Sequence, residues 1–197
     1  MYLVSQFGSY YDATVRPYLF LVTDAMTTAD LHPSEYHSYY GRYINKLSEA
    51  VHLRDGLAVG RRTVGAFFEQ LPEAKLTHRY APDKWSIKEV FQHLIDTERI
   101  FAYRAFRIGR GDPAPLADFD QNLYVSPSQA QQKSRAVLLA EFVAVRDSSI
   151  ALVNSFTDED LRRMGVASGH PMSARAAAFT IIGHEVWHMD VINELYL

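Results

Sequence analysis

His184 and His188 stand four positions apart near the end of the chain, in the string GHEVWH at residues 183–188. The apolar residues around them have helical spacing, and residues at i and i+4 lie one above the other on one face of a helix. Both imidazoles can therefore point at a common atom, which is most simply a metal ion. Cysteine is absent from the chain, so any metal site must use nitrogen and oxygen ligands.

The helix that carries this pair is predicted to begin after Ser173, which acts as its N-cap, and to continue to Leu197. Its core-type positions are spaced alternately four and three residues apart, as on the inward face of a bundle helix. These positions are Ala177, Ile181, His184, His188, Val191 and Leu195. Two histidines thus fall on the face that should be buried.

The same string matches H-E-x-x-H, the zinc metalloprotease signature in which the glutamate is the general base. Such proteases take a third ligand from beyond the motif, but only nine residues follow His188, and none of them is a histidine. Glu194 lies on the same helix, off the His188 face, and Val191 replaces the glycine of the metzincin form. A metal-dependent hydrolase therefore stays an alternative, whereas a protease is disfavoured.

A third ligand is expected from an upstream helix, and His93 is the best-placed candidate. It lies beside the inward stripe of a helix that begins at a capping box formed by Ser86 and Glu89. The other histidines fall in predicted loops or at a helix end: His32, His37, His52, His78 and His170. Three neutral imidazoles leave coordination positions open to water or substrate, as in catalytic sites. The alternative is three buried histidines hydrogen-bonded to polar neighbours.

The rest of the pattern predicts the elements that must position these histidines. Four long helices are expected, at about 52–71, 86–108, 127–156 and 173–197, and no strand. Residues 36–43 are expected to be an extended or irregular lead-in, and 165–171 a loop. The fold class is therefore all-α, a four-helix bundle with a long connection between the second and third helices.

Residues 1–35 show no sustained helical period and are assigned to an N-terminal extension of uncertain order, with 36–197 as the bundle domain. The net charge of -3, from 20 basic and 23 acidic residues, gives no broad positive field for nucleic acid. The apolar run at 18–22 is too short to span a bilayer and lacks a basic flank. A cytoplasmic protein without a membrane or nucleic-acid partner is expected.

Several segments together resemble the DinB-like (YfiT-like) family of metal-dependent four-helix bundles, over about residues 36–197. They are WSIKEV at 85–90, HLIDTER at 93–99, RGD at 110–112, the loop at 115–120, AVR at 144–146, and GHE at 183–185 with His188. The resemblance implies a metal triad at His93, His184 and His188. The most similar subgroup often carries paired histidines where this chain has Trp187 followed by His188, so the ligand is kept and its neighbour changes.

This resemblance implies a zinc or nickel ion and an enzyme of the thiol S-transferase type. A cation held by neutral ligands lowers the pKa of a bound thiol or water, which then attacks a small electrophile. The implied partner is a small molecule, such as a low-molecular-weight thiol, and a homodimer is also implied. A non-catalytic binding module stabilised by its metal is the alternative from another class, and a fourth protein ligand would favour it.

Two carboxylates are candidate catalytic residues, Asp96 and Glu185. Asp96 lies one turn beyond the helix-two histidine, where it could orient a ligand or act as a base. Asp96 and Glu98 could equally form ordinary helix salt bridges with Arg99 or Arg104. Glu185 lies about 100° around the helix from its neighbouring histidine, so a supporting role at the site or a contact between subunits competes with plain solvent exposure.

Overall fold

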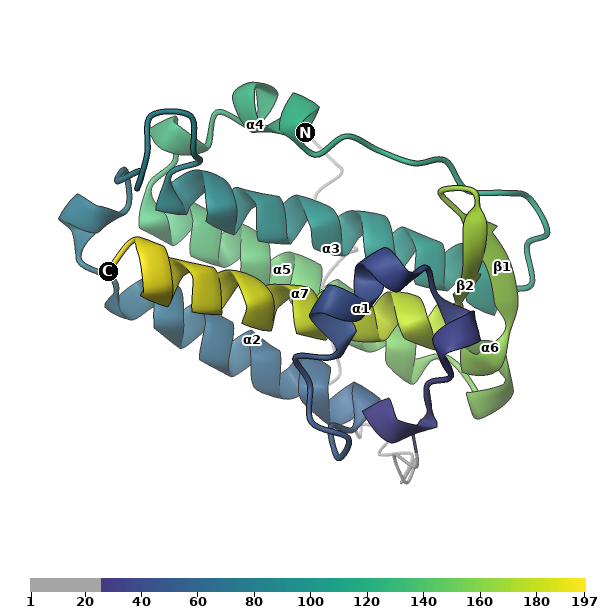
Figure 1. Cartoon of the computed structure of the whole chain (residues 1–197). Coiled ribbons are helices and arrows are strands. Elements are labelled where there is room, and N and C mark those ends of the chain that lie inside the picture. Colours follow the sequence, from purple (N-terminus) through teal and green to yellow (C-terminus); the bar gives the residue numbers. More distant parts are fainter. Residues whose placement is uncertain (1–25) are drawn as a thin grey trace, which may run out of the picture.

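The computed structural model describes residues 26–197, and the segment 1–25, which includes the apolar run at 18–22, lies outside the described residues. Four long helices form a bundle: α2 (Leu53–Gln70), α3 (Ile87–Gly109), α5 (Arg135–Asn154) and α7 (Ala174–Leu195). Helices α3 and α7 share the most extensive contact, and α5 packs on α2 and α3 (Figure 1). This arrangement confirms the predicted all-α four-helix bundle. Within residues 26–197, no helix combines the length and apolar character that spanning a membrane requires.

Side-chain caps fix the N-termini of three helices, two of them at the predicted residues Ser86 and Ser173. Ser86 Oγ accepts a hydrogen bond from the Glu89 amide at 3.3 Å, and the Glu89 carboxylate accepts one from the Ser86 amide at 2.7 Å. Ser173 Oγ accepts from the Ala176 amide and caps α7, and Thr157 forms a capping box with Asp160 at the start of the short helix α6 (Asp158–Arg162). Each cap satisfies amide donors that have no partner within the helix, so the start of α3 and hence the depth of His93 are well defined.

The third long helix begins later than predicted. Pro127 lies inside a separate short helix, α4 (Asn122–Ser128), and α5 begins only at Arg135. Between them, Gln129 adopts the left-handed conformation with φ of 51°, which ends α4, and a short 3-10 turn follows at Ala130–Gln132. Ser134 then accepts from the Val137 amide and caps α5. The connection between the second and third helices is long, as predicted, but it contains a helix of its own.

A β-hairpin replaces the predicted loop at 165–171. Strands β1 (Met164–Ala167) and β2 (His170–Ser173) pair in antiparallel fashion. The two residues between them, Ser168 and Gly169, both have positive φ, 53° and 76°, as the favoured two-residue hairpin turns require. The prediction of no strands was wrong because strands of four residues are too short for alternation to stand out.

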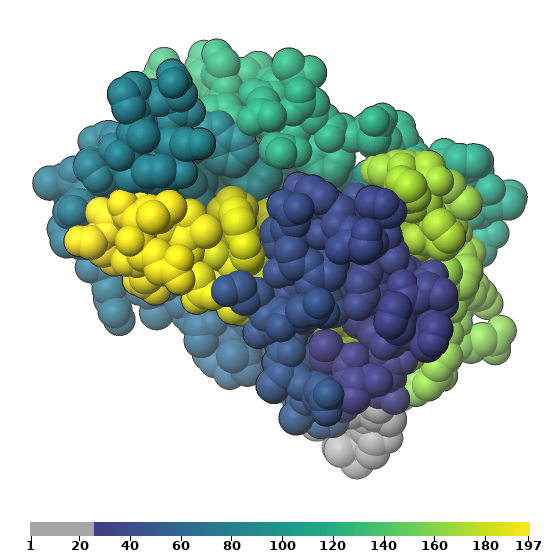
Figure 2. Space-filling view, viewed as in Figure 1, coloured from purple at the N-terminus to yellow at the C-terminus, as the bar shows by residue number. Residues whose placement is uncertain are grey.

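The segment 36–43 is also more regular than predicted, since α1 (Ser38–Ile44) occupies most of it. His37 Nδ1 accepts from the Tyr39 amide and caps this helix. Helix α1 crosses α7 at Gly183, where a Cβ atom would overlap the backbone carbonyl of Tyr43. Figure 2 shows the first described segments lying over the middle of α7. The close crossing places α1 beside the part of α7 that contains His184 and His188.

Residues 26–35, which the sequence assigned to the extension, pack against the bundle through two short 3-10 turns at Thr28–Asp30 and Pro33–Glu35. Met26 is fully buried. Glu35 and Arg175 form a bidentate ion pair, with Nε–Oε2 and Nη2–Oε1 distances of 2.7 and 2.6 Å. This pair ties the segment to the first turn of α7.

We expect Glu35→Gln to lower the free energy of unfolding by about 2 kcal/mol, because it leaves the Arg175 charge largely buried and uncompensated. Burial alone raises the pKa of Glu35, but hydrogen bonds from Arg175 and from the His32 amide outweigh it and lower the pKa. A lowered folded-state pKa means that the stabilisation is complete above the unfolded pKa of about 4.3 and is lost as the pH falls. Denaturant unfolding at pH 7 and pH 3 measures both effects.

The exposed pair between Lys46 and Asp190 is a matched control, because its two side chains are 40 and 43% exposed. Asp190→Asn should leave stability unchanged, since screened surface ion pairs contribute little. A Glu35→Gln protein as stable as the Asp190→Asn protein at pH 7 would show that the Glu35 pair does not anchor the segment.

The core is divided into two apolar clusters with a polar layer between them. One cluster includes the second half of α3 and the start of α7, and the other includes the first half of α3 and Ile192 near the end of α7. Buried polar residues lie at the intermediate level of the helices: Thr97, Glu98, Arg146, His184, Glu185 and His188. Burying so many polar groups in one layer is unfavourable unless they are paired or bind a ligand.

Candidate metal centre

The three predicted ligand histidines converge on one point in the polar layer. His184 Nε2 lies 3.1 Å from His93 Nε2 and 3.1 Å from His188 Nε2. One nitrogen from each ring lies within 4.8 Å of the others. His184 and His188 are buried on α7, and His93 is partly buried on α3. The third histidine therefore lies where its position beside the inward stripe of α3 predicted.

The donor set and its spacing fit a divalent cation. Burial lowers the pKa of His93 to about 4. Burial lowers the pKa of His184 well below its ordinary value, and the neighbouring His188 and His93 lower it further. Burial also lowers the pKa of His188 well below its ordinary value, with a smaller contribution from His93. The rings are thus neutral at pH 7, the form that binds metal. Zinc–nitrogen bonds of about 2.0–2.1 Å in a tetrahedral site place two nitrogens about 3.3 Å apart, close to the spacing observed.

Neighbouring side chains fix the orientation of the rings. Thr97 Oγ1 lies 3.3 Å from His93 Nδ1, so the hydroxyl can bond the nitrogen that faces away from the centre. The Tyr43 ring meets His184 edge-on at a centroid distance of 4.9 Å, and Trp187 meets His188 edge-on at 4.7 Å. His188 Nδ1 is buried and has no hydrogen-bond partner among residues 26–197. The rings are thus held mainly by packing, with Thr97 as the polar support.

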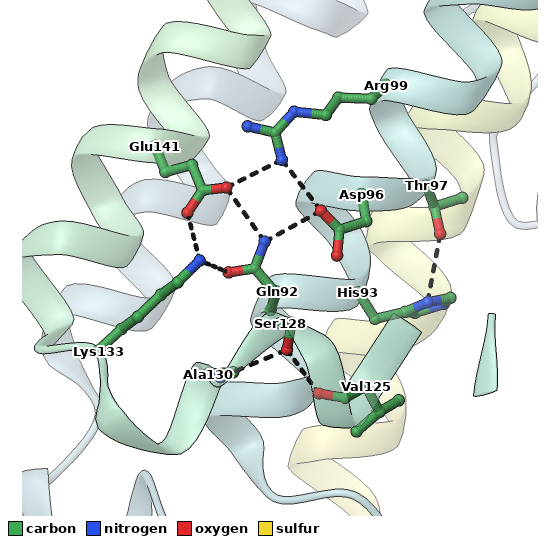
Figure 3. Close-up of polar contacts among 10 residues, drawn as sticks. All are labelled: Gln92, His93, Asp96, Thr97, Arg99, Val125, Ser128, Ala130, Lys133 and Glu141. Carbon is green, nitrogen blue, oxygen red and sulfur yellow. Dashed lines mark hydrogen bonds and ion pairs between the residues drawn. The ribbon is translucent and has the colours of Figure 1, made fainter. Parts of the chain in front are cut away.

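Asp96 belongs to a cluster of ion pairs between α3 and α5. Its carboxylate accepts from Arg99 Nη1 and from Gln92 Nε2, both at 3.0 Å. The cluster consists of Gln92, Asp96, Arg99, Lys133 and Glu141. Figure 3 shows the Asp96 carboxylate facing this cluster, whereas the His93 ring points to another side of α3. The salt bridge with Arg99, one of the two predicted roles of Asp96, is present.

Glu185 lies in a buried ion network behind the histidines. Arg146 binds Glu98 in bidentate fashion, at 2.8 and 2.9 Å, and its Nη2 also donates to Glu185. All three residues are at most 3% exposed, so the alternative of plain solvent exposure for Glu185 was wrong. Burial raises the pKa of Glu185 to about 7, although Arg146 acts in the opposite sense. Glu98 pairs with Arg146, and the salt bridge with Arg99 or Arg104 that was one of its possible roles is not formed among residues 26–197.

Gly60 on α2 makes room for this network. A Cβ atom at that position would overlap the Glu185 carboxylate and the Arg146 guanidinium. Arg146 Nη1 also donates to the Leu57 carbonyl of α2 at 3.2 Å. The role of Arg146 was not predicted; its position four residues after Phe142 and three before Ser149 places it on the same buried face of α5 as those two residues. The network therefore joins all four long helices directly beneath His184.

Two neighbouring cavities open on the histidines and share part of their lining, including Tyr39, Tyr43 and His93. The smaller, of about 170 Å³, is lined by His93 and His184. The larger, of about 300 Å³, is lined by His93 and His188, together with Trp85 and Trp187. Within the described chain, no fourth His, Cys, Asp or Glu joins the three-histidine group. The group therefore has the open geometry of catalytic metal sites and not the closed one of structural sites.

Comparison with known proteins places this architecture in a family. The model of the DinB superfamily matches residues 57–192, more than half of the chain. Among solved structures, the chain is similar to YfiT from Bacillus subtilis, described as a probable metal-dependent hydrolase with an unusual four-helix bundle topology. The TM-score is 0.64 at 17% identity, over 76% of this chain and 90% of that one, which supports the shared fold. No curated protein matches the sequence. The chain belongs to the DinB superfamily.

Proposed function

We propose that the chain is a metal-dependent enzyme in which His93, His184 and His188 hold one divalent cation, with zinc and nickel as the metals to test first. The observation that carries the proposal is the convergence of three neutral imidazole nitrogens in a buried layer that two cavities reach, with His184 Nε2 at 3.1 Å from each of the other two. When bound there, the cation would supply Lewis acidity and lower the pKa of a coordinated thiol or water.

The residues of the chain would orient and shield this centre. Thr97 holds the His93 ring, and the buried network of Arg146 fixes the part of α7 that carries His184. The Tyr43 and Trp187 rings pack edge-on against His184 and His188, where they would shield one side of the histidines from water. Exclusion of water strengthens electrostatic interactions inside such a site.

Group transfer is the reaction class that we favour, with a small thiol as nucleophile and a small electrophile as acceptor. Its support is the presence of two neighbouring cavities at the histidines, one reaching His184 and the other His188, because a transferase must hold two organic reactants. Hydrolysis is the second candidate, in line with the description of YfiT. Glu185 would not be the general base in either reaction, because Arg146 holds it in the buried network. A non-catalytic module would need a closed site, and the three-histidine group has no fourth protein ligand within residues 26–197.

The test compares metal-depleted protein with the same protein reloaded with zinc or nickel. Each form is assayed for conjugation of a panel of small thiols to 1-chloro-2,4-dinitrobenzene, and separately for hydrolysis of p-nitrophenyl acetate. We expect thiol conjugation above the uncatalysed rate only in the reloaded protein. Ester hydrolysis without conjugation would support the hydrolase instead. Reloaded protein that binds metal yet turns over neither substrate would contradict an enzymatic role.

A further inference from the structure

Arg104 is a buried cation without a counter-ion in the described chain. It is 1% exposed, and its hydrogen bonds go only to neutral groups: Tyr40 Oη at 3.1 Å, the Ala117 carbonyl at 3.0 Å and Ser168 Oγ at 2.7 Å. No ion pair joins it to a carboxylate among residues 26–197. Arg146 and Arg175, the other buried arginines, each have a carboxylate partner. Because a buried charge is strongly unfavourable without compensation, a negative group from a ligand would stabilise this site.

The side chains around Arg104 are also walls of the smaller cavity. Phe101 and Phe119 lie 5.1 and 5.4 Å from the guanidinium carbon, measured to the ring centroids. These two rings, Tyr40 and Ser168 all line the cavity that opens on His93 and His184. The positive charge therefore lies directly behind the wall of a space that leads to the candidate metal centre.

Two hydroxyl groups can transmit this charge to a ligand. Tyr40 Oη and Ser168 Oγ each accept a hydrogen bond from Arg104, so their own hydrogens remain free to donate elsewhere. Bonding to a cation also polarises a hydroxyl and makes it a stronger donor. Two donors match the two oxygens of a carboxylate, and one guanidinium balances its single negative charge. A phosphate monoester, with a charge near -2, would exceed that balance.

We propose that the smaller cavity binds the carboxylate of a small substrate through Tyr40 and Ser168, with Arg104 supplying the compensating charge. The reacting end of that substrate then points toward His93 and His184, and its apolar body lies against Phe101 and Phe119. The identification of this ligand as a substrate rests on the proposed function. The carboxylate site itself requires no metal.

Benzoate and benzamide test the site, because they share a ring and differ in charge. We expect calorimetric titration of metal-free wild-type protein to show benzoate binding at least about 10-fold more tightly than benzamide. The reason is that hydrogen bonds to a charged carboxylate are stronger than hydrogen bonds to a neutral amide. Phenyl phosphate, titrated in parallel, should bind more weakly than benzoate. Equal affinity for benzamide, no binding of benzoate, or preference for phenyl phosphate would overturn the proposal.

Two variants assign the binding to the hydroxyls. Tyr40→Phe and Ser168→Gly should each weaken benzoate binding by about 10-fold, and glycine suits the positive φ of residue 168. Tyr103→Phe is the matched control, because the Tyr103 hydroxyl also accepts from an arginine, Arg107, but is not part of the cavity wall. Unchanged benzoate affinity in both cavity variants would overturn the assignment.

The same titrations separate this proposal from the proposed function. Benzoate binding that depends on Tyr40 and Ser168, in a protein without metal-dependent turnover, would support the carboxylate site and leave the enzyme proposal contradicted. Metal-dependent turnover in a protein that does not distinguish benzoate from benzamide would support the enzyme and overturn the carboxylate site.

Discussion

His184→Ala is expected to weaken zinc or nickel binding by more than about 100-fold. Loss of a residue that only hydrogen-bonds to a metal ligand already weakens metal affinity by about 10- to 100-fold, and loss of a ligand itself should cost more. His184 should have the largest effect of the three histidines, because its Nε2 is the one that lies 3.1 Å from both others. Competition with a chromophoric chelator measures the affinity. Catalytic turnover should be lost together with the metal.

The exposed loop residue His78 provides the control, since His78→Ala removes an imidazole without touching the polar layer. Thermal unfolding adds a second readout, because a ligand that binds only the folded state raises its stability in proportion to the logarithm of its concentration. Added zinc should raise the melting temperature of wild-type and His78→Ala protein but not that of His184→Ala. Wild-type affinity in the His184→Ala protein would contradict the three-histidine site.

Arg146→Met is expected to lower the free energy of unfolding by about 3–5 kcal/mol, the cost of leaving buried charge uncompensated. The change leaves Glu98 and Glu185 facing each other in a layer where both are 3% exposed. Chemical denaturation of the metal-free protein measures this effect separately from metal binding. If the free energy of unfolding of the Arg146→Met protein is within about 1 kcal/mol of the wild-type value, the network is not required for stability.

The combined variant Arg146→Met, Glu98→Leu, Glu185→Leu tests the reason for that loss. Replacing a whole buried ion network by apolar residues of similar volume is often neutral or stabilising, so the triple variant should recover most of the stability. Arg61→Met is the control for loss of an arginine charge that is not buried. The Arg61–Asp147 pair also joins α2 to α5, as Arg146 does, but it lies at the exposed surface. We expect no measurable change in its stability.

The bundle and its candidate ligands could be predicted because their signals are local. Helical spacing and the cap at Ser86 fixed α3, and an i, i+4 histidine pair on an apolar face predicted α7. His93 followed from its position beside an inward stripe. These inferences need only the geometry of a single helix, which is why the structure reproduces them.

The sequence did not reveal how many neighbours each helix has. The predicted stripe of α7 includes Leu195, which is 48% exposed, whereas Ile192 is fully buried. From Ala174 to Glu185 every residue of α7 is buried, because α1, α2 and α3 all pack on it. The predicted stripe identifies only one buried face of α7, and Glu185 does not lie on that face. The sequence therefore did not decide whether Glu185 is buried or exposed. Its partner Arg146 is 39 residues away in sequence, and no local pattern links the two.

Short elements were missed for a related reason. The hairpin at 164–173 and helix α1 depend on contacts with the bundle more than on their own residue pattern. The turn at Ser168 and Gly169 was the one available local signal for the hairpin. The left-handed Gln129, which separates α4 from α5, gave none, because glutamine rarely adopts that conformation.

X-ray absorption spectroscopy of the zinc- or nickel-reloaded protein tests the central claim most directly, because it reports the atoms bound to the metal. We predict one metal per chain with three imidazole nitrogens in its first shell and the remaining positions filled by light atoms from solvent. The spectrum of His78→Ala protein should be the same. Failure to bind a stoichiometric metal, or a first shell with fewer than three imidazoles, would contradict the assignment of His93, His184 and His188 as its ligands.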